Sequence, residues 1–177
     1  MDLIKDFKYK EMEAIHFTHT DQRVKEMILK WRNDETVRLN MFNDEIISRE
    51  EHSRFIENLL EDTHNSYWIV KKDSNWIGVV SINRFDILNQ HAYLGIYVNP
   101  ELQGQGFGKR LIDLLTNKIF KEARLHSLKL EVIVNNIPAI NLYKKAGFKE
   151  EGRLREFVLK EKKWHDVLIM GVTKNEN

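Results

Sequence analysis

Apolar residues recur every three or four positions in four segments of the chain, which is the spacing that places them on one face of an α-helix. These segments are residues 21–31, 48–60, 111–120 and 136–146. The second begins with Ser48 and carries Glu51 three residues later. That pair predicts a capping box, in which each side chain accepts a hydrogen bond from the backbone amide of the other residue. The pattern therefore predicts four main helices.

Shorter apolar runs, in which polar residues alternate with apolar ones and turn formers stand at the ends, predict strands. They cover residues 14–17, 66–72, 76–82, 92–98, 127–134, 148–160 and 164–173. The last two predict a terminal hairpin around the charged turn Glu161-Lys162-Lys163. Strand, helix and strand alternate after residue 92. We therefore expect a mixed α/β fold, with a central twisted sheet of about seven strands flanked by helices on both faces.

Length and composition favour one globular domain over residues 1–177. A chain of 177 residues, 42% of them hydrophobic, can bury a sizeable core, and it contains no linker rich in proline, glycine or serine. The 28 basic and 27 acidic residues leave a formal charge of +1, so no overall field recruits nucleic acid or an anionic membrane. Charged N-terminal residues and the lack of a long apolar run lead us to expect a cytoplasmic protein without a membrane segment.

Cysteine and histidine usage narrows the chemistry. The chain has no cysteine, which excludes disulfides and a thiolate nucleophile. Its seven histidines form neither a helical His-x-x-x-His pair nor a cluster with carboxylates. We therefore expect no metal site.

Three glycines alternate in the segment Gln103-Gly104-Gln105-Gly106-Phe107-Gly108, between an apolar strand and a helix. Glycines let the backbone turn tightly and approach a ligand, so that amide groups and the positive end of a helix converge on a phosphate. Lys109 stands where a dinucleotide-binding fingerprint needs glycine, and the spacing from Gly104 to Gly108 is one residue short for a P-loop. The pattern excludes both of those phosphate sites and leaves an ordinary glycine-rich turn as the alternative to a ligand loop.

The same loop resembles the (Arg/Gln)-x-x-Gly-x-(Gly/Ala) loop of the GNAT acetyltransferase superfamily. Downstream, Asn136-Ile-Pro-Ala-Ile-Asn-Leu-Tyr-Lys-Lys-Ala-Gly-Phe148 resembles the Asn-x-x-Ala-x-x-Leu-Tyr-x-x-x-Gly-Phe segment of that superfamily. The resemblance implies an acetyltransferase that uses acetyl-CoA as cosubstrate, without a metal. It also implies a set of cofactor-binding residues on the strand before the loop, the loop itself and the later helix. These are Ile96, Val98, Gln103, Gly104, Gln105, Gly106, Phe107, Gly108, Lys109, Asn136 and Tyr143.

Acetyl transfer to an amine needs an acid for the departing thiolate and a base for the ammonium group. The resemblance places Tyr143 near the sulfur, where a phenol with an ordinary pKa near ~10 stays protonated before the reaction. For the base we favour Glu131, which alternation puts on the opposite face of its strand from the apolar Leu130 and Val132. The alternative is that Glu131 pairs with a cation near the edge of the sheet. Backbone amides of residues 95–98 are expected to polarise the thioester carbonyl, as in the superfamily.

Weaker similarities lie in the segments Lys30-Trp-Arg-Asn33, Met41-Phe42, His52-Ser-Arg-Phe-Ile56 and His91-Ala-Tyr-Leu-Gly-Ile-Tyr97. Together they resemble the nucleotide-sugar N-acetyltransferases of pseudaminic acid biosynthesis, a pathway that serves flagellin glycosylation. The resemblance implies a UDP-linked 4-amino-4,6-dideoxy sugar, UDP-4-amino-4,6-dideoxy-N-acetyl-β-L-altrosamine, acetylated at its C4 amine. It suggests six substrate-binding residues: Arg32, Met41, Phe42, His52, Arg84 and Tyr93. For Arg32 the alternative is a cation at a helix end, and for Met41 and Phe42 it is a loop anchored in the core.

Two other functions remain open at this stage. A polyamine or protein N-terminal acetyltransferase shares the same chemistry, although a polyamine site should be lined by acidic groups and the chain offers only Asp34-Glu35 and Asp44-Glu45 as local clusters. A non-catalytic acetyl-CoA-binding module is the option from a different class, and the presence of Tyr143 argues against it. The expected partner is a small molecule, and the oligomeric state stays open, with a homodimer as one option.

Overall fold

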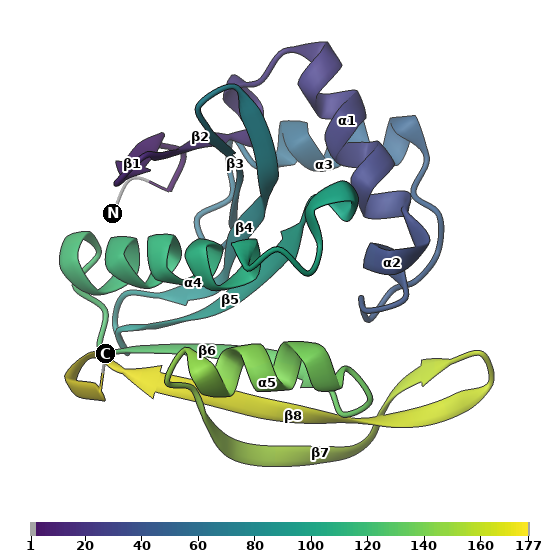
Figure 1. Ribbon diagram of the computed structural model, residues 1–177, viewed down its shortest axis with the longest axis vertical. Helices are drawn as coiled ribbons and strands as arrows, with labels where there is room; N and C mark the ends of the chain where they lie inside the picture. The colour runs from purple at the N-terminus through teal and green to yellow at the C-terminus, as the bar shows by residue number, and fades with distance from the viewer. Residues whose placement is uncertain (1–2, 177) are drawn as a thin grey trace.

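The computed structural model describes residues 3–176, in which eight strands form one mixed sheet (Figure 1). The strands are β1 (Phe7–Tyr9), β2 (Met12–His16), β3 (Ser66–Lys72), β4 (Asn75–Asp86), β5 (His91–Val98), β6 (Ser127–Ile133), β7 (Lys149–Lys160) and β8 (Lys163–Thr173). Their order across the sheet is β1-β2-β3-β4-β5-β6-β8-β7. Neighbouring strands are antiparallel except β5 and β6, which run parallel.

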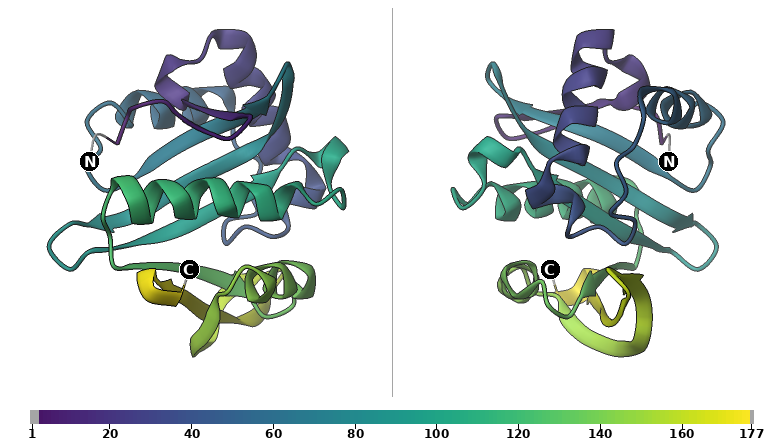
Figure 2. Two further views of the ribbon diagram at one scale, coloured as in Figure 1. Left: turned by 60° about the vertical axis from the view of Figure 1, so that its left-hand side comes forward. Right: turned by 90° about the vertical axis from the view of Figure 1, so that its right-hand side faces the viewer.

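The helices divide between the two faces of the sheet (Figure 2). Their bounds are α1 (Gln22–Asn33), α2 (Glu35–Arg38), α3 (Arg49–Asn58), α4 (Phe107–Asn117) and α5 (Ile137–Lys145). Helices α1 and α3 pack against β3 and β4 on one face, and α4 and α5 cover the other face. The predicted mixed fold with helices on both faces is therefore confirmed.

The sheet has one strand more than the seven or so predicted from the sequence. The additional strand, β1, has three residues, of which only Phe7 is buried, and it pairs with β2 through a short turn. A single buried residue leaves no alternation to read, so the pattern could not reveal this strand. The strand predicted at residues 14–17 corresponds to β2 and begins two residues earlier.

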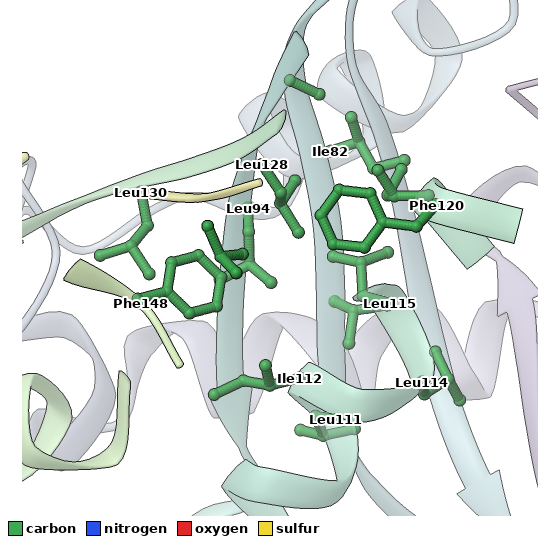
Figure 3. Packing of buried hydrophobic residues seen from close by; sticks show 14 of the residues in the cluster. Ile82, Leu94, Leu111, Ile112, Leu114, Leu115, Phe120, Leu128, Leu130 and Phe148 are labelled. Carbon is green, nitrogen blue, oxygen red and sulfur yellow. The ribbon is translucent and has the colours of Figure 1, made fainter. Parts of the chain in front are cut away.

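Helix α4 holds the larger core together. Its inward face carries Leu111, Ile112, Leu114 and Leu115, each at most 1% exposed. They pack against side chains from the sheet and from the residue just before β7, among them Ile82, Leu94, Leu128, Leu130 and Phe148 (Figure 3). Burying each leucine or isoleucine is worth roughly 1.5–3 kcal/mol, so this face fixes α4 and the loop that precedes it firmly onto the sheet.

A smaller core lies on the opposite face. Ile28 and Trp31 of α1 and Ile56 of α3 pack there against Ile69 and Val79 of the sheet. The predicted capping box begins α3, since the Ser48 amide donates to Glu51 Oε2 at 2.8 Å and the Glu51 amide donates to Ser48 Oγ at 3.2 Å. These contacts fix the α1–α3 layer, which forms one wall beside the centre of the sheet.

Candidate active site

Strands β5 and β6 separate in the middle of the sheet. They pair over only three positions, from His91 with Ser127 to Tyr93 with Lys129. Beyond these, residues 94–98 pair with β4, and residues 130–133 pair with β8. Alternate peptide groups of a strand point to opposite sides, so half of those at 94–98 face the gap between β5 and β6. The two strands therefore separate beyond residue 93, and the peptide groups of residues 94–98, among them Ile96 and Val98, that face away from β4 have no partner on β6.

The glycine loop lies between the end of β5 and the start of α4. Gly104 and Gly106 have positive φ angles of 76° and 81°, and open space of at least 4 Å surrounds the position where a Cβ would stand at each. Gly106 is the N-cap of α4 and provides no side-chain hydrogen bond to the first turn. The amides at the start of α4 therefore remain available to an anion, and the residues present fit the pyrophosphate of acetyl-CoA.

The third glycine has a different purpose. A Cβ at Gly108 would lie 2.7 Å from Leu142 Cδ2 of α5, so the absent side chain allows α4 and α5 to approach each other. This contact brings together the two sequence motifs that are separated along the chain. In Figure 1 helix α4 runs alongside β5, and α5 runs alongside β6 and β8.

The polar side chains of the loop bind to the protein itself. Gln103 Nε2 donates to Thr36 Oγ1 at 3.1 Å, Gln105 Nε2 donates to the Glu101 carbonyl at 3.3 Å, and Lys109 forms an ion pair with Asp113. Phe107 is half-buried against the main core. The predicted contacts of this loop with a cofactor therefore fall to its backbone amides rather than to these side chains.

Two predicted residues of α5 lie at its start and in its buried face. Asn136 is the N-cap, and its Oδ1 accepts a hydrogen bond from the Ala139 amide at 3.2 Å, which leaves its Nδ2 as a donor. Tyr143 is 8% exposed and packs at 6.0 Å from the Phe148 ring. Burial raises the pKa of Tyr143 to about 12, so the phenol stays protonated at neutral pH.

Glu131 is held by an arginine. Arg84 donates to both of its carboxylate oxygens, at 3.0 and 2.5 Å, and the Arg84 guanidinium lies 4.0 Å from the centre of the Tyr93 ring. The carboxylate raises the pKa of Arg84. An irregularity in β4 between Asn83 and Asp86 gives Arg84 a positive φ of 50°. The three predicted residues Arg84, Glu131 and Tyr93 therefore form one cluster, and the alternative of an ion-paired Glu131 describes this geometry.

The segment that we call the acceptor loop, residues 39–47, is bound by cationic side chains. Arg32 Nη2 donates to the Asn43 carbonyl at 2.6 Å, and Arg38 Nη1 donates to the Asp44 carbonyl at 3.0 Å. Burial lowers the pKa of Arg32, and its Nη1 is buried with no hydrogen-bond partner among the described residues. Arg32 thus ties the end of α1 to the acceptor loop, a role that its sequence position alone did not suggest.

A third cation reaches the same loop from the end of the chain. Lys160, the last residue of β7, donates from Nζ to the carbonyls of Leu39 and Met41 at 2.5 and 2.8 Å, and its Nζ lies 3.6 Å from Asp44 Oδ2. The lysine is 8% exposed. This residue was not predicted, because nothing in the hairpin sequence indicates that its side chain meets a segment about 120 residues earlier.

The remaining predicted acceptor residues differ in their surroundings. Phe42 is 37% exposed and packs its ring at 6.3 Å from Phe157 of β7, while Met41 is half-buried. His52 is 7% exposed, and its Nε2 donates to the Lys25 carbonyl at 3.1 Å, which joins α3 to α1. Burial lowers the pKa of His52, so its ring stays neutral. His52 contributes to helix packing, and a contact with substrate stays a prediction.

Tyr97 is a polar residue of the site that sequence reasoning missed. It alternates with Tyr93 on β5 and packs with the smaller core, on the same face as α1 and α3. Burial raises its pKa, and the positive charge of Arg32 opposes that shift. The signal was present in the period-two spacing of Tyr93, Gly95 and Tyr97, which places all three on one face of the strand.

A cavity of about 230 Å³ lies between the acceptor loop, the end of β6 and the tip of the β7–β8 hairpin. Asp44 and Lys160 line it together with Ile133, Asn136 and Glu161. The cavity is therefore continuous with the site residues at the start of α5. Within residues 3–176, no group of three or more histidine, aspartate or glutamate side chains is placed to hold a metal ion. None of the helices in that range is long and apolar enough to cross a membrane.

Comparisons with known proteins agree with this geometry. Residues 25–148 match the family model described as the acetyltransferase (GNAT) family. Acetyltransferase PseH from Campylobacter jejuni is 30% identical over 133 residues, which cover 75% of this chain and 82% of the relative. Spermidine N(1)-acetyltransferase from Vibrio cholerae is 28% identical over 145 residues, 81% of this chain and 84% of the relative. A crystal structure of the Vibrio cholerae spermidine N-acetyltransferase in complex with CoA and spermine superposes with a TM-score of 0.86 at 24% identity, covering 95% of this chain and 98% of that one.

Proposed function

The chain belongs to the acetyltransferase (GNAT) family, and we propose that it transfers the acetyl group of acetyl-CoA to the C4 amine of a UDP-linked 4-amino-4,6-dideoxy sugar. Membership of the family makes the protein an acetyl-CoA-dependent N-acetyltransferase. The acceptor, the roles of individual residues and the action of residues 1–177 as a single domain are proposals. So are a place in pseudaminic acid biosynthesis and a cytoplasmic location, where acetyl-CoA and nucleotide sugars are made.

The chemistry assigns a task to each part of the site. Acetyl-CoA supplies a thioester whose carbonyl carbon bonds to the amine while the carbon–sulfur bond breaks and the sulfur leaves as a thiolate. The amides of residues 104–109 hold its pyrophosphate, and the unpaired N–H groups of residues 94–98 donate to the thioester oxygen as negative charge develops there.

Tyr143 acts at the sulfur. The neutral phenol donates a hydrogen bond to the departing thiolate and transfers its proton as the carbon–sulfur bond breaks. Burial disfavours the thiolate as much as the phenolate, so this hydrogen bond is the principal means of dispersing charge in a dry site. Glu131 takes the proton of the attacking amine on a lone pair that does not face Arg84.

The observation that carries the acceptor proposal is the charge around the acceptor loop. Three cationic side chains, Arg32, Arg38 and Lys160, bond to this loop, whereas the loop itself contains two acidic residues, Asp44 and Glu45. A cationic excess attracts a diphosphate and works against a polycation. The 30% identity to an acetyltransferase named PseH supports the same choice.

A polyamine is the second candidate acceptor. Asp44 and Glu161, which lie far apart in the sequence, both line the cavity at the end of β6, and two carboxylates in one cavity suit an ammonium group. The similarity to the Vibrio cholerae spermidine acetyltransferase favours this candidate as well. The buried ammonium of Lys160, 3.6 Å from the Asp44 carboxylate, counts against it.

Release of free CoA thiol, measured with a panel of amines at equal concentrations, tests the proposal. The panel contains a UDP-4-amino-4,6-dideoxyhexose, the same amino sugar without UDP, spermidine and an N-terminal peptide. We expect the nucleotide sugar to give the highest kcat/KM, and loss of UDP to lower it by roughly 100-fold or more, because remote contacts help to position the amine. A higher kcat/KM for spermidine or for the free sugar would rule out the nucleotide-sugar acceptor while leaving the acetyltransferase intact.

A further inference from the structure

Lys160 is a buried cation whose side-chain hydrogen bonds and ion pair, among residues 3–176, are made to the acceptor loop. Its ammonium group donates to the carbonyls of Leu39 and Met41 and lies 3.6 Å from the Asp44 carboxylate. Lysine is almost never buried to this degree without paired groups, because the charge loses its hydration. With three N–H donors and three oxygen neighbours, Lys160 is matched to this loop and to no other part of the described chain.

The β7–β8 hairpin has an irregular pairing and a tight turn next to Lys160. The pairing of β7 with β8 is interrupted between Leu154 and Val158, and the turn after Lys160 holds Glu161 and Lys162 at positive φ angles of 48° and 62°. Left-handed conformations of residues other than glycine cost roughly 1–2 kcal/mol each. Such conformations persist only where surrounding contacts fix them. At this tip the fixing contact is the pairing of Lys160 with Lys163, which closes a two-residue hairpin turn and leaves the Lys160 side chain against the acceptor loop.

The Lys160 contacts also orient the loop. In a trans peptide the carbonyl of one residue and the N–H of the next point in opposite directions. The hydrogen bond from Lys160 to the Met41 carbonyl therefore turns the Phe42 amide away from Lys160 and sets the plane of the peptide between these two residues. The ring contact of Phe42 with Phe157 is the other link here between loop and hairpin.

We propose that Lys160 is a positioning residue for the acceptor: by holding residues 39–44 against the hairpin, it keeps the acceptor loop in the conformation that binds the amine substrate. Arg32 and Arg38 bind the later part of the loop from α1 and α2, which are its neighbours in sequence. Lys160 binds the earlier part from the far end of the chain and lines the cavity that the loop closes. Lys160 lies outside the glycine loop and outside the region where β5 and β6 separate. The proposal rests on the proposed acetyltransferase site but not on the identity of the amine.

The variant Lys160→Met removes the donors and the charge while keeping most of the side-chain volume, and Lys160→Arg keeps a cation that can donate to two carbonyls. Lys163→Met, at an exposed position on the same hairpin, is the control. The KM for the amine should rise roughly 10- to 100-fold in Lys160→Met, the worth of hydrogen bonds from a charged donor. The kcat and the Kd of acetyl-CoA should stay within about twofold, because the thioester end of the site is untouched. Lys160→Arg should recover part of the loss, and Lys163→Met should behave as wild type.

Hydrogen exchange provides a readout that does not depend on the acceptor. Amides of residues 39–47 should exchange faster in Lys160→Met than in Lys163→Met, with little change in α4. If the wild type fails to acetylate the nucleotide sugar, the acceptor proposal falls, and the same KM comparison is made with whichever amine is accepted. Unchanged exchange and an unchanged KM in a folded Lys160→Met variant would overturn the role of Lys160.

Chemical labelling of the wild type covers the case in which Lys160→Met does not fold. An amine-reactive acetylating reagent should modify Lys162 and Lys163 rapidly and Lys160 slowly, and saturation with the amine substrate should slow labelling of Lys160 further. Labelling of Lys160 at the rate of Lys163 would show that the contact with the loop does not persist in solution, and the proposal would fail.

Discussion

Two side chains, the buried Tyr143 of α5 and the half-buried Glu131 of β6, are the candidates for proton transfer. Tyr143 has a raised pKa because it is desolvated, and its hydroxyl therefore remains a donor throughout the physiological range. The Glu131 side chain is 11% exposed, and both of its carboxylate oxygens accept hydrogen bonds from Arg84. The Tyr143 geometry matches its proposed role directly, whereas Glu131 can accept a proton only on the lone pairs that do not face Arg84.

Tyr143→Phe should lower kcat by roughly 10- to 1000-fold, because it removes a positioned proton donor and leaves the ring packing against Phe148 in place. The affinity for acetyl-CoA, measured by calorimetry, should change little. Since the pKa of Tyr143 is raised to about 12, wild-type kcat should show no loss due to this phenol between pH 8 and 10. Tyr9→Phe, on the outer strand β1, is the control for loss of a hydroxyl. An unchanged kcat in Tyr143→Phe would remove the residue from the mechanism.

Glu131→Gln and Arg84→Met together separate a base from an ion pair. If Glu131 accepts the amine proton, Glu131→Gln should lower kcat/KM by roughly 100-fold near pH 7 and by less near pH 9, where free amine forms without help. Arg84→Met should then keep most of the activity, because it frees the carboxylate. Equal losses in both variants at every pH would identify a structural ion pair, which at this exposed arginine is worth only roughly 0.2–1 kcal/mol.

At the level of elements, the contact between the start of α4 and the middle of α5 makes one site of two motifs. Gly108 allows the approach, while Gly104 and Gly106 provide the left-handed turns that aim the loop amides. The sequence identified all three glycines as a group. The structure assigns them to different tasks, because a positive φ and a close helix contact are both met by glycine and look the same in a sequence.

Gly106→Ala and Gly108→Ala should therefore have different effects. An alanine at Gly106, where φ is 81°, is strained by roughly 1–2 kcal/mol in this conformation. The loop of the free variant should relax, and binding must restore the strained conformation, so the affinity for acetyl-CoA should fall by about 5- to 30-fold. At Gly108 the new methyl group meets the tip of the Leu142 side chain, which can rotate away, so affinity should fall less. Isothermal titration with acetyl-CoA measures both. Equal affinities for the two variants would contradict the assignment of the loop amides to the pyrophosphate.

At the scale of the molecule, the site depends on one parallel pair within a largely antiparallel sheet. Because β5 and β6 are joined over only three positions, residues 94–98 of β5 have no partner on β6, and they lie directly before the glycine loop. The α1–α3 layer closes the other face and is itself joined through His52 and Lys25. The stability of that layer should therefore depend on pH.

The neutral ring of His52 predicts that the protein becomes less stable as pH falls. Its pKa is lowered by burial in the folded state, whereas the unfolded chain titrates near ~6.5. The unfolded state therefore binds more protons on acidification, and stability is lost as the pH falls through that value toward the lower folded pKa. Urea denaturation between pH 5 and 8 should show a shallower pH dependence for His52→Gln, which can still donate to the Lys25 carbonyl. His64→Gln, at an exposed position, is the control, and identical slopes in all three proteins would contradict the prediction.

The sequence by itself determined the features that depend on neighbouring residues. The helical spacing of α4, the capping box at Ser48 and Glu51, the turn at residues 161–162 and the glycine loop all arise within a few positions, where geometry follows directly from residue type. Both motifs of the family are local in this sense, and they were enough to predict the family and its cosubstrate.

Only the tertiary structure decided which distant groups meet. The pairing of Arg84 with Glu131 spans 47 residues, and the contact of Lys160 with the Met41 carbonyl spans 119. The chain has 28 basic and 27 acidic side chains, so the sequence offers many partners for each charge and no local rule selects one. The choice is made by strand register and by where β5 and β6 separate, which are set by packing of the whole sheet against α4 and α1.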